Sequence, residues 1–359
     1  MRWWWWMAAL AAGGPAALPV RADPLTQAAV ELGSATGRRD LEIAVSRGAG
    51  PVEVRAFGRP VDATVSTGSA RKWLTAALIL TLVDERRMTL DDPVAWHLPA
   101  WDLPGRRRIT VRMLLSHTSG LPPRPPPGGC SGQGTLEACV DRMAGLRLLD
   151  PPGAAFRYST AGFNVAARVA ELVGRAPYRE LLIERLLEPL GMRDTSLRRA
   201  GPGLSEMVGE VWTTPRDFHK FVRMVLDRGV SGGRRVLSEA AVAEMEAGQT
   251  GAAPNHGGVP KRTWWEPGHD YYGLGMWRNA ADPDGRLSIA SAEGRGGFVA
   301  WIDRARGVAG VASVHDHDPA WLEPSPPSVV QVVGELGDAL LAPASVTSVD
   351  LGERGIAAR

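Results

Sequence analysis

The sequence predicts an α/β chain of the α+β type, in which one antiparallel sheet is built from both ends of the chain and flanked by helices. Apolar and polar residues alternate near the start, over residues 40–58, and short alternating runs return after residue 268. Between these two regions the apolar spacing is mostly helical. Strands grouped at the two ends do not give the strand–helix alternation of a parallel sheet.

The first alternating run predicts a hairpin that turns at residues 48–51, where glycine and proline interrupt it. The proline-rich stretch 92–127 predicts loops and short helices. A later helix begins at "TTPRDFHKF", where Thr214 fits the N-cap, Pro215 the first turn and Asp217 the third position of a capping box. The other expected helices cover 25–32, 70–83, 136–146, 163–173, 178–187 and 329–341. The later strands are expected over 271–278, 287–292, 298–303 and 308–314.

The N-terminal 22 residues have the features of a secretory signal: an arginine, a short apolar run and a small-residue site ending at Ala22. An uncleaved anchor is the alternative, but Gly13, Gly14 and Pro15 interrupt the run well short of a bilayer-spanning helix. We therefore expect a secreted or periplasmic mature chain with no transmembrane segment. Residues 1–22 form the expected signal, 23–345 the domain with a helical insert at about 90–200, and 346–359 a tail.

Charge argues against a nucleic-acid partner. Without Arg2 and Arg21 of the expected signal, the 41 cationic residues become 41 − 2 = 39, which equals the 39 anionic residues. No basic stripe interleaved with aromatic residues occurs in the sequence.

The chain has one pair of cysteines, Cys130 and Cys139, nine positions apart across a glycine-rich stretch. In an oxidising compartment such a pair favours a disulfide over two free thiols. Closing so short a loop would stabilise the fold by roughly 2 to 3 kcal/mol.

Lysine is rare in this chain, which makes one of its lysines informative. Of 41 cationic side chains only Lys72, Lys220 and Lys261 are lysines. Guanidinium stays protonated at any working pH, so a lysine is needed where an amine must give up its proton. Lys72 follows Ser69 by three positions at the start of an expected helix, which places amine and hydroxyl on one face. Because serine becomes a good nucleophile only when a base takes its proton, the pair suggests catalysis; the alternative is an ordinary surface lysine.

Three segments, "GSARKWLTAA" at 68–77, "ITVRMLLSHTSGL" at 109–121 and "PPGAAFRYSTAGFN" at 151–164, together resemble the serine β-lactamase-related family. This family comprises class C β-lactamases, penicillin-binding DD-peptidases, and related esterases and amidases such as 6-aminohexanoate-dimer hydrolases. The resemblance runs in order from about Gly68 to Val314. It implies the β-lactamase/transpeptidase-like fold.

The resemblance also implies roles. Ser69 would be the acylated nucleophile, Lys72 its partner, and Tyr158 the group that takes and returns the proton. The backbone N–H groups of Ser69 and Arg295 would form the oxyanion hole. The expected substrate is a small ester, amide or peptide, and neither a metal nor an organic cofactor is implied.

Two departures from the family pattern bear on the substrate. Thr160 replaces the usual asparagine two positions after the tyrosine; its hydroxyl can still reach the lysine but offers no amide. The third motif, usually Lys or His, any residue, then Gly, aligns with Ala292, Glu293 and Gly294, so its cation is missing. If Glu293 faces the site, it would repel substrate carboxylates unless Arg295 compensates; the opposite orientation is equally open. We therefore expect an esterase or amidase, with a β-lactamase or DD-peptidase, or a non-hydrolysing binding domain, as alternatives.

Other candidate sites fit less well. Ser231 lies in "GVSGG", a G-x-S-x-G match, but it follows an expected helix in a glycine-rich turn, whereas a nucleophile elbow follows a strand. His117 is interpreted as a structural loop residue near the site. The "HDHD" run at 315–318 has metal-ligand residue types, but adjacent ligands do not easily converge on one ion, so a solvated loop is expected.

Overall fold

The structure is a computed structural model, which describes residues 25–28, 40–124, 135–198, 210–256, 270–294 and 296–314. The expected signal, tail and last helix lie outside these residues, as do Cys130, Arg295 and the 315–318 run, so these predictions stay untested. Among the residues described, no helix combines the length and apolar character needed to cross a membrane.

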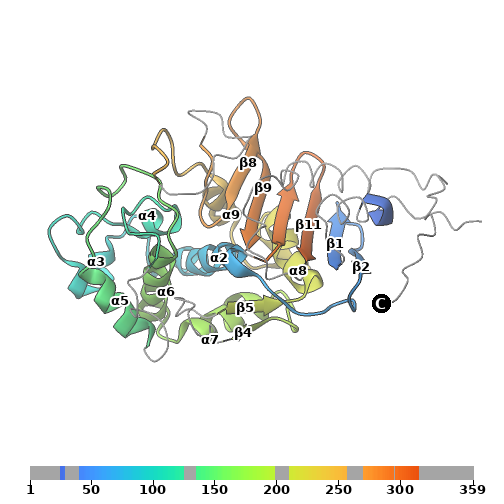
Figure 1. Cartoon of the computed structure of the whole chain (residues 1–359), viewed down its shortest axis with the longest axis horizontal. Helices are drawn as coiled ribbons and strands as arrows, with labels where there is room; N and C mark the ends of the chain where they lie inside the picture. The colour runs from blue at the N-terminus through green and yellow to red at the C-terminus, as the bar shows by residue number, and fades with distance from the viewer. Residues whose placement is uncertain are drawn as a thin grey trace, which may run out of the picture.

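One six-stranded antiparallel sheet joins the two ends of the described chain, in the order β2-β1-β11-β10-β9-β8 (Figure 1). The two chain ends meet where β1 pairs with β11, with Leu41 opposite Val314. The α+β fold predicted from the sequence is therefore confirmed. The strands of this sheet are β1 (Leu41–Arg47), β2 (Glu53–Phe57), β8 (Trp277–Ala281), β9 (Leu287–Gly294), β10 (Phe298–Asp303) and β11 (Val308–Val314).

The predicted hairpin forms β1 and β2, and the strand predictions for β10 and β11 agree with the structure. The expected strand over 271–278 is largely wrong, because β8 begins only at Trp277. The preceding segment instead folds over the helices: the Gly275 N–H donates to the Leu115 carbonyl at 3.1 Å. A Cβ on Gly275 would lie 2.4 Å from the Lys72 carbonyl oxygen, and its φ of +75° also favours glycine.

The helical part lies between β2 and β8 in the sequence, and its most deeply buried helix, α2 (Arg71–Asp84), runs between the sheet and the other helices (Figure 1). The predicted helix over 70–83 is confirmed by α2. Further helices are α3 (Val94–His97), α4 (Val111–Leu115), α5 (Leu136–Ala144), α6 (Thr160–Gly174), α7 (Tyr178–Leu182), α8 (Pro215–Leu226) and α9 (Glu239–Glu246). Shorter turns of helix are η1 (Gly68–Ala70), η2 (Pro99–Trp101) and the π-type η3 (Ile183–Leu187).

Helix α8 begins as its sequence predicts. The Thr214 hydroxyl accepts a hydrogen bond from the Asp217 N–H at 3.1 Å. The Asp217 carboxylate does not complete a capping box, because it accepts from the Asp194 N–H at 2.7 Å and from the Lys220 ammonium at 2.6 Å. Helix α9 was not expected, although Ser238 caps it with a side-chain bond to the Ala241 N–H at 2.9 Å.

Two apolar clusters lie on opposite faces of the large sheet. The larger joins Ala290 and Ala292 of β9 to the helices, including α2 and α8. The smaller joins Ile289 of β9 and Val299 of β10 to β1 and residues 25–28. Because successive residues of a strand point to opposite faces, the even-numbered residues of β9 point toward the helices.

Two smaller sheets were missed from the sequence, since strands of two to four residues give too short a pattern. One has the order β3-β5-β4, from β3 (Val65–Ser66), β4 (Ser196–Arg198) and β5 (Glu210–Thr213). The other is a hairpin of β6 (Val230–Ser231) and β7 (Arg234–Arg235).

Candidate active site

Ser69 lies in the single turn η1, between strand β3 and helix α2. Strand β3 is fixed to β5, and the Thr67 N–H donates to the Val211 carbonyl at 2.9 Å. The first N–H groups of a helix have no acceptor within the helix. In the described part of the chain the Ser69 N–H has no hydrogen-bond acceptor, so this donor is available to an oxyanion.

Lys72 lies one turn later and is 1% exposed. Its Nζ donates to the Ser69 Oγ at 3.1 Å. The amine lies 4.7 Å from the ring centroid of Tyr158 and 5.7 Å from that of Phe163. Over the described ranges, no carboxylate forms an ion pair with Lys72. The amine is therefore buried beside the serine hydroxyl, among aromatic rings, and within hydrogen-bond reach of the atom that it would have to deprotonate.

Tyr158 precedes α6, whose N-cap Ser159 accepts from the Gly162 N–H at 3.1 Å. The Tyr158 ring is stacked on Trp277 of β8, with centroids 5.8 Å apart and planes 6° apart. The His117 ring also lies against it, with centroids 4.3 Å apart and a tilt of 40°. The Tyr158 hydroxyl makes no hydrogen bond to any residue that the structure describes. The structure thus brings Ser69, Lys72 and Tyr158 together, while their roles stay predictions.

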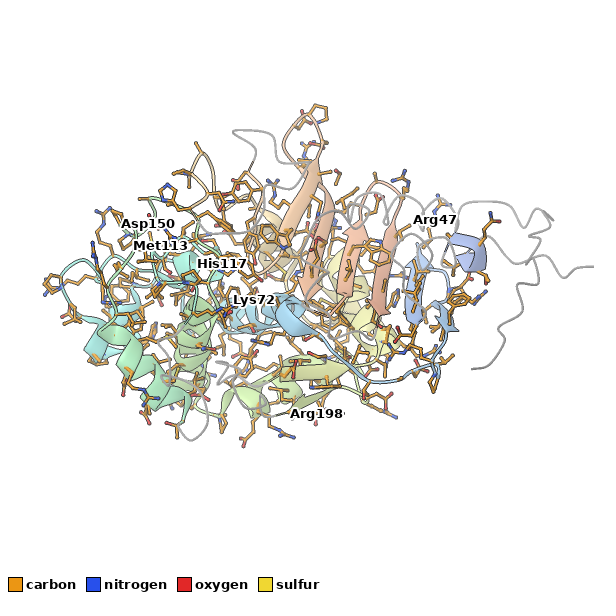
Figure 2. All side chains as sticks on the ribbon, in the orientation of Figure 1. Arg47, Lys72, Met113, His117, Asp150 and Arg198 are labelled. Atoms are coloured by element: carbon orange, nitrogen blue, oxygen red, sulfur yellow. The ribbon has the colours of Figure 1, made fainter. Side chains whose placement is uncertain are left out.

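His117 is buried beside this group; Figure 2 shows it and Lys72 where the helical part meets the sheet. Its Nδ1 accepts from the Ser159 N–H at 2.9 Å, and its Nε2 lies 3.1 Å from the Tyr272 hydroxyl. Since Nδ1 accepts, the proton of the neutral ring belongs on Nε2 and is donated to Tyr272. Burial, and then the positive charge of Lys72, lower the pKa of His117 well below its usual range.

The third-motif segment ends β9 against the nucleophile turn. A Cβ on Gly294 would lie 2.0 Å from the Thr67 carbonyl oxygen, so only glycine allows this approach. Gly294 and Ala292 therefore point toward η1 and α2. Glu293 points to the opposite face, the face of Ile289 and of its pairing partner Val299. The question that the sequence left open is answered by this alternation: the carboxylate of Glu293 is directed away from the side of α2.

Thr160 is the first residue of α6 and is half-buried. Its N–H donates to the Pro123 carbonyl at 2.9 Å. In the described structure its hydroxyl makes no hydrogen bond to Lys72, so the bridge that its chemistry would allow is not present.

The remaining candidates lie elsewhere or are structural. Ser231 ends β6 in a hairpin, not on a strand-to-helix turn, which agrees with its rejection as a nucleophile. Lys220 is held by Asp217 and by the Gly191 carbonyl, at 2.6 and 2.5 Å. Cys139 is buried in α5, and its pairing with Cys130 stays a prediction.

Sequence reasoning missed the aromatic surroundings of the site. Phe163 could have been found, because it lies five positions after Tyr158 in the quoted motif. Tyr272 and Trp277 reach the site from a segment more than 100 residues later; "YGLGMW" at 272–277 lies within the family resemblance, but the sequence pattern gave these two rings no place at the site.

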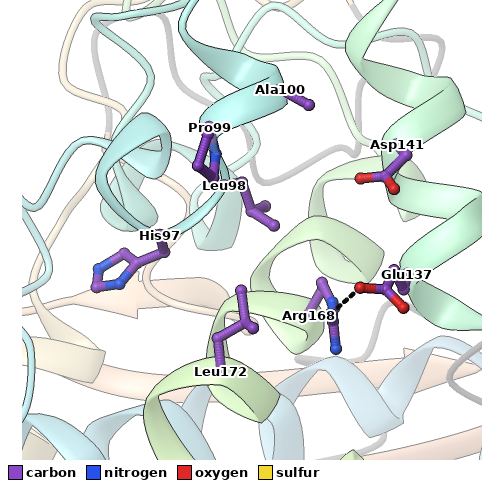
Figure 3. Close-up of a pocket in the computed structure, with 8 residues that line it drawn as sticks. All are labelled: His97, Leu98, Pro99, Ala100, Glu137, Asp141, Arg168 and Leu172. Carbon is purple, nitrogen blue, oxygen red and sulfur yellow. Dashed lines mark hydrogen bonds and ion pairs between the residues drawn. The ribbon is translucent and has the colours of Figure 1, made fainter.

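A cavity of about 190 Å³ lies away from these residues, between the α3–η2 segment and helices α5 and α6 (Figure 3). An ion pair between Arg168 and Glu137, 2.6 Å long, crosses one side of it. No residue of the Ser69 group lines this cavity, so it is not the candidate active site. Its lining residues are His97, Leu98, Pro99, Ala100, Glu137, Asp141, Arg168 and Leu172.

Comparison with known proteins agrees with this geometry. The sequence profile of the β-lactamase family, described as "Beta-lactamase", matches residues 25–333. The chain belongs to the β-lactamase family. Members of this family with the same fold are serine hydrolases. The family resemblance predicted from the sequence is therefore confirmed.

Two curated relatives of this β-lactamase-family chain match only in part. Penicillin-binding protein 4 of Amycolatopsis lactamdurans is 30% identical over an alignment of 220 residues, and the match covers 51% of this chain and 56% of the relative. The D-alanyl-D-alanine-carboxypeptidase/endopeptidase AmpH of Escherichia coli is 28% identical over an alignment of 196 residues, and the match covers 46% of this chain and 50% of the relative. The chain thus spans about half the length of these relatives.

Solved structures match over more of the chain. A putative β-lactamase from Bacteroides dorei has a TM-score of 0.74 and 29% identity, covering 81% of this chain and 90% of its own. A family VIII carboxylesterase has a TM-score of 0.71 and 19% identity, covering 90% and 99%. A D-stereospecific amidohydrolase from Streptomyces has a TM-score of 0.62 and 24% identity, covering 82% and 94%. The last two likenesses concern the fold alone.

Proposed function

We propose that this protein is a serine hydrolase that cleaves an ester or an amide through an acyl-enzyme on Ser69. The 3.1 Å contact between the Lys72 Nζ and the Ser69 Oγ carries the proposal. In its neutral form the amine accepts the serine proton, with Tyr158 as its partner in the transfer. The Ser69 N–H lies free to bind the oxyanion that forms on the attacked carbonyl.

The proton balance follows from these positions. As the Ser69 Oγ forms a bond to the carbonyl carbon, its proton passes to the Lys72–Tyr158 pair. The pair returns that proton to the leaving alcohol or amine when the bond to the leaving group breaks. Water then attacks the acyl carbonyl and gives a proton to the pair, which returns it to the Ser69 Oγ as the bond between this atom and the acyl carbon breaks, so that the acid and the free Ser69 hydroxyl are released.

The missing cation of the third motif favours substrates without a carboxylate near the scissile bond. A lysine or histidine at position 292 would point toward η1, but Ala292 offers no charge there. The binding of a neutral ester or amide does not depend on a cation at that position. A substrate carboxylate would lose its hydration there without gaining an ion-pair partner. The names of two neighbours in fold, a carboxylesterase and an amidohydrolase, agree with such substrates.

A second candidate function is action on β-lactams or on D-alanyl peptides. The relatives in its favour are those named penicillin-binding protein 4 and D-alanyl-D-alanine-carboxypeptidase/endopeptidase. Against it stands the uncharged Ala292. The third possibility, a binding domain without turnover, is weaker because Ser69, Lys72 and Tyr158 are all present.

We also propose export of the chain and a Cys130–Cys139 disulfide, from the features of residues 1–22 and the oxidising compartment that export implies. Mass spectrometry of the purified protein tests both. A mature chain starting at Asp23, 2 Da lighter than its reduced form, is expected. An intact Met1 on exported protein, or two free thiols, would contradict these proposals.

Intact-protein mass spectrometry tests the main function. Wild type and Ser69→Ala are each incubated with a fluorophosphonate and with a penicillin. A Ser69-dependent fluorophosphonate adduct is expected, together with turnover of a p-nitrophenyl ester. Penicillin adducts or nitrocefin turnover that require Ser69 would favour the second candidate instead. No adduct from either reagent would favour the binding domain.

A further inference from the structure

We infer that His117 is a positioning residue for the proposed reaction, which holds Tyr158 beside Lys72 by accepting a backbone hydrogen bond. The inference rests on the proposed serine hydrolase function. It assigns a task to a side chain that the sequence identifies only as part of a loop.

His117 holds the backbone on both sides of Tyr158. Its carbonyl oxygen accepts from the Arg157 N–H at 2.8 Å, and its Nδ1 accepts from the Ser159 N–H at 2.9 Å. One residue thus holds the N–H groups of residues 157 and 159, which flank the tyrosine in the sequence. Only the Cα atoms of Arg157 and Tyr158 lie between these two N–H groups, so the tyrosine backbone has little freedom to move.

The same imidazole also confines the tyrosine ring. The imidazole centroid lies 4.3 Å from the centroid of Tyr158, whose ring is also stacked on Trp277 at 5.8 Å. Phe163, the other ring near the Lys72 amine, has its centroid 5.2 Å from that of His117. His117 therefore contacts both aromatic side chains that surround the amine.

Acceptance at Nδ1 requires one tautomer, and the surroundings select it. The ring is 1% exposed, and its Nε2 faces the Tyr272 hydroxyl at 3.1 Å, which can accept the Nε2 proton. A proton on Nδ1 would oppose the Ser159 N–H, so a doubly protonated ring cannot keep both bonds. These two hydrogen bonds hold His117 as a neutral ring that accepts at Nδ1.

The backbone conformation of His117 limits which substitutions can be used to test its role. His117 has a φ of +62°, a left-handed conformation in which asparagine and histidine are enriched. The Oδ1 of asparagine can occupy the place of Nδ1 and accept from Ser159. Glutamine can replace only the outer nitrogen, the donor to Tyr272, and leaves the Ser159 N–H without its acceptor.

The test compares His117→Asn with His117→Gln, using the rate of fluorophosphonate labelling of Ser69 and the steady-state hydrolysis of a p-nitrophenyl ester. The Gln variant should label and turn over about 100-fold more slowly than wild type, with KM within about threefold, because a misplaced proton-transfer group lowers kcat. The Asn variant should recover to within about tenfold of wild type. His219→Asn, at a buried histidine on α8, is the control for general loss of stability and should label at the wild-type rate per folded molecule.

Equal losses in the Asn and Gln variants, or a wild-type labelling rate in the Gln variant, would overturn the inference. Failure of wild type itself to label would instead refute the proposed function. If the Gln variant does not fold, histidine NMR of wild type decides, with the His117 signal assigned by its absence in the Asn variant. A neutral ring protonated on Nε2 between pH 6 and 8 is expected; a proton on Nδ1 would overturn the inference.

Discussion

The Lys72 Nζ lies 3.1 Å from the Ser69 Oγ, in a buried position with no carboxylate partner among the residues described. Replacing Lys72 with arginine would keep the charge but remove the ability to become neutral. We expect Lys72→Arg to lower kcat/KM for an ester by about 10²- to 10⁴-fold. Lys220→Arg is the control, because Lys220 pairs with Asp217 at 2.6 Å and an arginine can do the same. Near-normal turnover of Lys72→Arg would mean that Lys72 acts through its charge, and comparable losses in both variants would point to a general effect of the larger side chain.

The Tyr158 ring can be kept while its hydroxyl is removed. In Tyr158→Phe the stacking on Trp277 should persist, whereas the proton-transfer group is lost. We expect kcat to fall by about 10²-fold or more with little change in KM. Tyr271→Phe, in the same aromatic cluster, should stay within about threefold of wild type. Unchanged turnover in Tyr158→Phe would leave Lys72 as the sole base.

Gly294 tests the contact between β9 and the nucleophile turn. The added methyl group of Gly294→Ala would lie 2.0 Å from the Thr67 carbonyl oxygen, and backbone must move to relieve this. We expect about 1 to 3 kcal/mol of destabilisation and at least a tenfold loss of kcat/KM, since Ser69 lies two residues after Thr67. The matched control is Gly145→Ala, where the nearest atom lies 3.7 Å away and the helical backbone suits alanine. Urea unfolding and ester hydrolysis of both variants provide the measurement.

The sequence was most informative where a single local pattern determined the result. The short apolar runs around Trp301 and Val311 predict strands, and β10 and β11 have the predicted bounds. The S-x-x-K spacing likewise places Lys72 and Ser69 on one face, because an α-helix brings residues three apart together.

Prediction was poorer where the outcome depended on contacts distant in sequence. The orientation of Glu293 follows from the sheet register with Val299, which no local pattern reveals. Tyr272 and Trp277 were expected in a regular strand, but the segment between them follows the surfaces of α2 and α4. The tautomer of His117 depends on Ser159 and Tyr272, two partners at 42 and 155 residues' separation.

His219 predicts how folding stability depends on pH. It is buried on α8, and its Nε2 lies 2.9 Å from the Ser46 hydroxyl. Burial, aided by the charge of Arg223, lowers the pKa of His219 to about 4. The unfolded chain, with a histidine pKa of about 6.5, therefore binds this proton more readily than the folded chain. The stability contributed by the neutral ring is complete above about pH 6.5 and is lost progressively as the pH falls toward about 4.

The measurement is urea unfolding of wild type and His219→Gln at pH 7 and at pH 5. Between these values the wild type should lose about 2 kcal/mol more than the variant, because glutamine does not titrate. Other groups that titrate in this range, including His117, contribute to both proteins and cancel in the comparison. If wild type and variant lost the same unfolding free energy between pH 7 and pH 5, His219 would bind a proton in the folded protein as readily as in the unfolded chain. Its buried surroundings would then not disfavour the charged ring.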